Sequence, residues 1–149
     1  DRLSKNIPLE GSNLIGRREW AGVSESGQVT RAKMDTGAYW SSLHVKSAEQ
    51  VGDKLEVMFD NGEEKAFDKF RMIDVAPTKG EADRRFAVKL NILIGDEQFE
   101  TDVTLTQRHG LRYKLLIGRR ALRLGGFIVD PSRSFHFKGS KEKINNRLK

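Results

Sequence analysis

The sequence of 149 residues contains no cysteine and very little histidine. The first absence excludes disulfide bonds, thiolate metal ligands and a cysteine nucleophile, although it says little about compartment. The three histidines, His44, His109 and His136, are isolated, whereas a zinc-protease helix would carry two of them within His-Glu-x-x-His. We therefore expect no metal site.

Two further motifs of enzyme chemistry are missing. Thr78-Lys79-Gly80-Glu81 does not have the Gly-Lys-Ser or Gly-Lys-Thr ending of an ATP-binding loop, so we expect no nucleotide cofactor. There is also no Gly-x-Ser-x-Gly elbow, and serine hydrolysis has no candidate nucleophile.

Apolar residues are scarce and never form a long run. Hydrophobic residues make up 37% of the chain and charged residues 32%. Because a run of about 18 apolar residues is missing, no membrane span is predicted. The length is enough for one domain with one core, either a small β domain with much exposed surface or one that completes its core by dimerising.

The net charge of +6 is concentrated at the C-terminus, where residues 138–149 carry five cations and one acidic residue, Glu142. We expect 1–13 to form an N-terminal arm, 14–137 a single domain, and 138–149 a solvated basic tail or an attachment to anionic partners. No nucleic-acid partner is expected, since the remaining residues carry little net charge.

The chain begins at Asp1 rather than at methionine, which indicates that an N-terminal segment was removed. Localisation stays open on these residues. A periplasmic location after removal of a signal is favoured over a cytoplasmic one.

Alternating polar and apolar residues predict an all-β fold. Asn61-Gly62 between two alternating runs is a strong hairpin signal, and Arg119 to Leu124, closed by Gly125-Gly126, is the one short helix expected. The predicted strands are Leu14 to Val23, Val29 to Met34, Leu43 to Val45, Lys54 to Phe59, Glu64 to Phe70, Arg71 to Val75, Arg84 to Ile94, Phe99 to Thr106, Leu115 to Ile117, Phe127 to Val129 and Phe135 to Phe137. The carboxylates interpreted as solvated groups near turns are Asp83, Asp96, Asp102 and Asp130.

The candidate reactive group is Asp35, at the end of the strand predicted over Val29 to Met34. Thr36 and Gly37 follow it, and the glycine allows a tight turn that brings backbone N–H groups close to the carboxylate. Asp-Thr-Gly is also typical of a simple turn between two strands, so the wider context decides its meaning.

That context resembles a retropepsin-like aspartic protease, and most closely the bacterial family named ATP-dependent zinc proteases. The similarity is carried by Lys33-Met34-Asp35-Thr36-Gly37-Ala38, by Ser41-Ser42-Leu43-His44, and by Leu115-Leu116-Ile117-Gly118-Arg119 before a short helix. It implies a closed antiparallel β-barrel of the acid protease type with one short C-terminal helix. Zinc and ATP in the family name gain no support from the residues.

The resemblance implies an aspartic endopeptidase in which Asp35 is the catalytic residue. An aspartic protease needs two carboxylates that share a proton, and one Asp-Thr-Gly per chain then requires a homodimer. Thr36, Gly37 and Ala38 would support the site, and a peptide or protein substrate would lie beneath a flap formed by Asp74 to Arg85. The residues expected to bind substrate are Tyr39, Trp40, Thr78, Lys79 and Gly80, and the structural motif expected near Asp35 is Leu116, Ile117, Gly118 and Arg119.

One departure concerns the dimer. In retroviral relatives an acidic residue stands at the position of Tyr39 and pairs with the arginine that matches Arg119, and that ion pair is absent here. Tyr39 and Trp40 would line a substrate pocket or pack as core or dimer contacts.

Two other functions fit the same residues. A catalytically silent β-barrel module would use the groove to bind a peptide or an anionic polymer without pairing Asp35. An OB-like nucleic-acid binder would expose aromatic residues along one sheet face, whereas most aromatic residues here alternate as core residues do.

Overall fold

Strands account for most of the regular structure. The computed structural model describes residues 13–75, 83–107, 112–137 and 140–149. The strands are β1 (Asn13–Gly16), β2 (Arg18–Val23), β3 (Gln28–Asp35), β4 (Ser41–Val51), β5 (Lys54–Phe59), β6 (Glu64–Phe67), β7 (Arg71–Val75), β8 (Asp83–Ile94), β9 (Glu97–Thr106), β10 (Leu115–Gly118) and β11 (Phe127–Asp130). The helices are α2 (Arg119–Leu124) and α3 (Ser140–Leu148).

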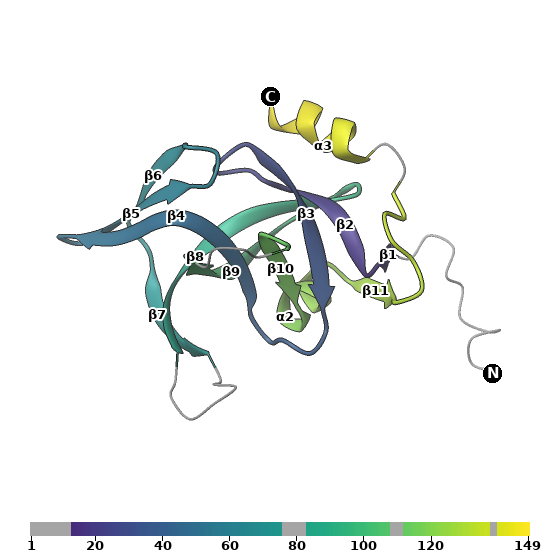
Figure 1. The fold of residues 1–149 in the computed structure, drawn as a ribbon, viewed down its shortest axis with the longest axis horizontal. Coiled ribbons are helices and arrows are strands. Elements are labelled where there is room, and N and C mark those ends of the chain that lie inside the picture. Colours follow the sequence, from purple (N-terminus) through teal and green to yellow (C-terminus); the bar gives the residue numbers. More distant parts are fainter. Residues whose placement is uncertain (1–12, 76–82, 108–111, 138–139) are drawn as a thin grey trace.

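Six strands close into a barrel in the order β10, β3, β2, β8, β9 and β4, with β4 pairing back to β10 (Figure 1). The expected all-β barrel is confirmed. Two of these pairings, β10 with β3 and β4 with β9, are parallel, so the barrel is mixed in strand direction. The parallel pairing of β10 with β3 places Gly118 beside Asp35.

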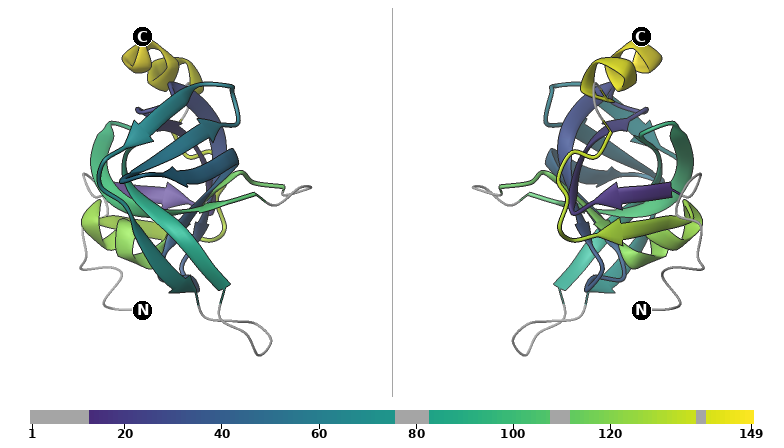
Figure 2. Two further views of the ribbon diagram at one scale, coloured as in Figure 1. Left: turned by 90° about the vertical axis from the view of Figure 1, so that its left-hand side faces the viewer. Right: turned by 90° about the vertical axis from the view of Figure 1, so that its right-hand side faces the viewer.

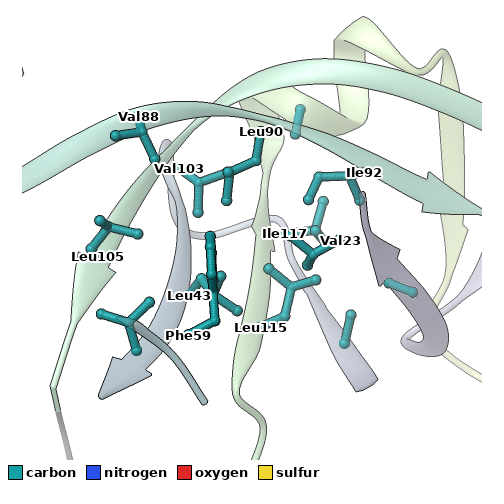
Figure 3. Packing of buried hydrophobic residues seen from close by; sticks show 14 of the residues in the cluster. Val23, Leu43, Phe59, Val88, Leu90, Ile92, Val103, Leu105, Leu115 and Ile117 are labelled. Carbon is teal, nitrogen blue, oxygen red and sulfur yellow. The ribbon is translucent and has the colours of Figure 1, made fainter. Parts of the chain in front are cut away.

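The barrel interior is filled by the apolar residues that the alternating pattern selects. In β8 and β9, Leu90, Ile92 and Val103 are fully buried, and they meet Leu43 and Leu115 from β4 and β10 (Figure 3). Each such side chain contributes about 1.5–3 kcal/mol by leaving water. The core therefore holds in place the strand ends that carry the candidate site.

Strand β4 continues beyond the barrel. Its first residues pair with β9 and β10, and after a register shift between Val45 and Ser47 the strand pairs with β5. The turn at Asn61-Gly62 joins β5 to β6, and Gly62 has φ +90°, which favours glycine. The predicted hairpin is thus confirmed, although β6 ends at Phe67 rather than at Phe70.

A second hairpin is formed by β7 and β8, which pair from Arg71↔Ala87 to Val75↔Asp83. It occupies the position expected for a flap, and it points away from the end of the barrel that α3 covers (Figure 2). The expected flap tip, with Thr78, Lys79 and Gly80, lies in 76–82, outside the described residues.

The single strand expected over Leu14 to Val23 is wrong, because the chain bends at Arg17 into β1 and β2. β1 pairs with β11 in a separate sheet. Glu19, which is 0% exposed, fixes this bend: its Oε2 accepts hydrogen bonds from Gly16 N at 2.7 Å and from His136 N at 2.9 Å. The strand expected over Phe135 to Phe137 is also wrong, since this segment wraps around Glu19 and Phe135 has φ +53°.

The solvated tail expected over 138–149 is wrong for Ser140–Leu148, which forms α3. Ile144 is 0% exposed and packs on Gly22 of β2, where a Cβ atom would lie 2.5 Å from Ile144 Cγ2. Arg147 Nη1 donates a 2.8 Å hydrogen bond to the Gly95 carbonyl. The chain therefore has a second C-terminal helix besides the predicted one. Neither helix of the described residues has the length and apolar character to cross a membrane.

Candidate active site

Asp35 ends β3 at the rim of the barrel, between the neighbouring strands β2 and β10. Its side chain is half-buried, while Thr36 and Gly37 are exposed. Gly37 N donates to Asp35 Oδ1 at 3.2 Å, and Ala38 N donates to the Asp35 carbonyl at 3.2 Å. The expected tight turn around the carboxylate is present, and it presents Asp35 at an open edge of the molecule.

The predicted motif Leu116, Ile117, Gly118 and Arg119 locks this turn in place. Arg119 N donates to the Ala38 carbonyl at 2.8 Å, and Gly118 N donates to Ser41 Oγ at 3.0 Å. A Cβ atom on Gly118 would lie 2.6 Å from the Tyr39 carbonyl oxygen, so this position accepts only glycine without movement of the turn. The two sequence motifs are therefore one structural unit.

Arg119 contacts the Asp35 turn without the ion pair that the matching arginine forms in retroviral relatives. Its Nη1 donates to the Gly37 carbonyl at 3.2 Å, and its Cζ lies 5.4 Å from the centre of the Tyr39 ring. A cation–π contact of this kind contributes about 0.5–1 kcal/mol at an exposed site. Tyr39 thus contacts the same arginine as the acidic residue it replaces, and it remains 40% exposed.

Trp40 lies on a cluster of charged residues that the sequence did not reveal. Arg71 and Arg120 stack on its ring, with Cζ atoms 5.3 and 5.7 Å from the ring centre. Both arginines also donate to Asp102 Oδ2, at 3.3 and 3.2 Å. Asp102 is only 6% exposed, so its interpretation as a solvated carboxylate is wrong.

Asp102 is buried because α2 and β7 lie over the outer face of β9. Alternation correctly placed Asp102 on the side of the strand away from Val103, but α2 and β7 bring Arg120 and Arg71 over that side. A polar residue at a strand centre was the available signal. The two arginines that bind Asp102 are distant in the sequence, so only the tertiary structure identifies them as its partners.

The base of the β7–β8 hairpin is tied to β4, the strand that follows the Asp35 turn. Arg85 of β8 donates from Nη1 to Ser42 Oγ at 3.4 Å and pairs with Asp83 through Nη2 at 2.7 Å. The structure thus brings Tyr39, Trp40 and the base of the β7–β8 hairpin together beside the Asp35 turn. Among the described residues, no group of three or more histidine, aspartate or glutamate side chains is arranged to hold a metal ion, and His109 lies outside them.

A protein-family model described as RimB-like, retropepsin-like aspartic endopeptidase RimB, matches residues 14–139. The chain belongs to this RimB-like family. The predicted retropepsin-like relationship is confirmed, whereas the similarity to the family named ATP-dependent zinc proteases is not supported, because the matching family is one of aspartic endopeptidases.

Curated relatives of this RimB-like chain are named "Probable alpha-L-glutamate ligase". The protein from Shewanella pealeana is 28% identical over 138 residues, which cover 82% of this chain and 29% of the relative. The one from Parasynechococcus marenigrum is 26% identical over 134 residues, covering 81% and 28%. The chain therefore matches less than a third of the length of these relatives.

A solved structure is also similar. The crystal structure of a protein of unknown function from Legionella pneumophila subsp. pneumophila has a TM-score of 0.65 and 30% sequence identity, and the match covers 84% of this chain and 98% of that one. The similarity thus extends over nearly the whole of that chain.

Proposed function

We propose that this RimB-like chain is an aspartic endopeptidase whose active unit is a homodimer with one Asp35 from each subunit. The observation that carries the proposal is the position of Asp35, at an open barrel rim on a turn locked by Gly118. A carboxylate buried inside the barrel could not meet a copy of itself. One at the rim can do so across a two-fold axis.

The chemistry follows from two carboxylates at short distance. They share one proton, since two like charges so close do not both stay ionised. The ionised carboxylate accepts a proton from water, which attacks the scissile carbonyl carbon. The protonated carboxyl donates a hydrogen bond to the carbonyl oxygen as negative charge develops there, and the proton taken from water passes to the amide nitrogen as the C–N bond breaks. Thr36, Gly37 and Ala38 hold the turn that sets the separation of the two groups.

The substrate in this proposal is an extended peptide that lies between the catalytic turn and the β7–β8 hairpin, as an added strand. Tyr39 offers an exposed aromatic face to its side chains. The glutamate ligase name of the relatives supports a glutamate-rich peptide as the first one to test. The cationic side chains of Arg71, Arg119 and Arg120 near the turn support the same choice.

Specific activity is expected to rise with protein concentration, since an isolated subunit holds only one of the two carboxylates. Each subunit has a net charge of +6, so moderate salt should favour association by screening the repulsion. Peptide cleavage and sedimentation should be measured on one dilution series at two salt concentrations. A fully active monomer whose specific activity does not change on dilution would exclude both the dimer and the shared-proton mechanism built on it.

A further inference from the structure

A second cationic site lies outside the catalytic turn, on the outer side of β2 and β3. A cavity of about 320 Å³ is lined by Arg17, Arg18, Lys33, Arg112 and Tyr113, which we call the basic cavity. Four of these five described residues are cationic and none is acidic. This differs from the cluster around Trp40, where Asp102 neutralises part of the charge.

Two of the cations that line the basic cavity, Arg18 and Arg112, contact a neutral group, the phenol of Tyr113. Arg18 Nη1 donates to Tyr113 Oη at 2.9 Å, and Arg18 Nε donates to Ser134 Oγ at 3.2 Å. Arg31 and Arg112 lie over the Tyr113 ring, with Cζ atoms 5.9 and 5.8 Å from its centre. Arg18, Arg31 and Arg112 are therefore preorganised around the phenol of Tyr113. Because the phenol is neutral, it does not offset their positive charges.

The electrostatic field of this group acts on the phenol itself. The hydrogen bond from Arg18 lowers the pKa of Tyr113 below its usual range, and the charges of Arg18, Arg112 and Arg31 lower it further. Tyr113 thus senses the positive potential of the cavity. An anion that entered it would weaken that effect.

We propose that the basic cavity binds a phosphate group. A carboxylate has two oxygens, which a single arginine fork can satisfy, whereas a phosphate offers three or more oxygens to several guanidinium groups at once. The four cations that line the basic cavity can contact several phosphate oxygens at once. Arg31 and Arg112 both lie over the Tyr113 ring, and recognition in this proposal rests on the phosphate rather than on stacking of a base.

Phosphate groups could come from a nucleic-acid strand or from a small phosphorylated compound. Calorimetric titration of the full chain with inorganic phosphate, pyrophosphate and single-stranded oligothymidylate separates the two. Oligothymidylate that binds more tightly than pyrophosphate, with a steep loss of affinity in salt, identifies a strand and revises the expectation of no nucleic-acid partner. Equal affinity for the two identifies a small ligand, and either result supports the site.

The variants Arg17→Ala and Arg112→Ala are each expected to weaken pyrophosphate binding by about tenfold, since each removes a charge-assisted contact. Arg123→Ala, which removes the same charge from an exposed position on α2, is the matched control and should bind as the parent does. Binding of none of the three probes, or equal losses in all three variants, would overturn the proposal.

Tyr113 supplies an independent readout. The chain has two tyrosines, so Tyr39→Phe leaves Tyr113 alone, and its phenolate can be followed by ultraviolet absorbance. Saturating pyrophosphate should raise the pKa of Tyr113, because the bound anion offsets the charges of Arg18, Arg112 and Arg31 that lower it. An unchanged titration, or a larger change with a glutamate hexapeptide than with pyrophosphate, would contradict a phosphate site.

Discussion

Replacing Asp35 with Asn is expected to lower kcat/KM for peptide cleavage by at least about a thousandfold, because both proton-transfer groups of the proposed active unit are lost together. The fold should remain intact. Asp35 is half-buried and accepts the 3.2 Å hydrogen bond from Gly37 N, and an asparagine oxygen can accept the same bond.

The experiment pairs cleavage of a glutamate-rich peptide with thermal unfolding of the same preparations. Asp53→Asn, at an exposed position in the turn between β4 and β5, removes an equal charge and should retain parental activity and Tm. If Asp35→Asn cleaved the peptide as fast as Asp53→Asn does, Asp35 would have no catalytic role in this chain.

The variant Gly118→Ala is expected to lower the free energy of unfolding by about 2–3 kcal/mol and to impair cleavage strongly. The added Cβ would lie 2.6 Å from the Tyr39 carbonyl oxygen and 2.6 Å from the Trp40 carbonyl carbon, and backbone atoms cannot swing aside as a flexible side chain can. The turn that carries Asp35 must therefore shift.

Gly37→Ala provides the stability control for this variant. A Cβ atom there would meet nothing closer than Asp35 Oδ1 at 3.4 Å, an ordinary contact, so the free energy of unfolding should change little. Urea unfolding of the two variants measures the difference directly. Equal stability of Gly118→Ala and Gly37→Ala would contradict a tight contact between the end of β10 and the Asp35 turn.

Local sequence patterns predicted the elements whose conformation is determined by residues close together in the sequence. Alternation identified β8 and β9, Asn61-Gly62 identified its hairpin, and the predicted helix Arg119–Leu124 has the observed bounds. Each of these features follows from a local signal: the two-residue period of a strand, a turn residue with positive φ, or glycine at the end of a helix. The order of Asp-Thr-Gly and Leu-Leu-Ile-Gly-Arg also predicted the candidate site.

What the sequence missed depends on contacts between distant segments. No sequence pattern indicated a role for Glu19, which is buried because segment 135–137 supplies N–H donors to it. Likewise, Ile144 is one of two apolar residues in the basic tail, the other being Leu148, and its burial depends on the space above Gly22. Asp102 became buried for a similar reason. No local pattern carries information of this kind.

Subunit mixing tests the shared Asp35 pair most directly. Wild-type and Asp35→Asn chains should be combined in equal amounts, allowed to exchange, and assayed for peptide cleavage per wild-type subunit. If one Asp35 from each subunit is required, only about a quarter of the dimers hold two wild-type subunits, and activity per wild-type subunit falls to about half. Activity per wild-type subunit that stays constant in every mixture would mean that each subunit acts alone, and would contradict the account.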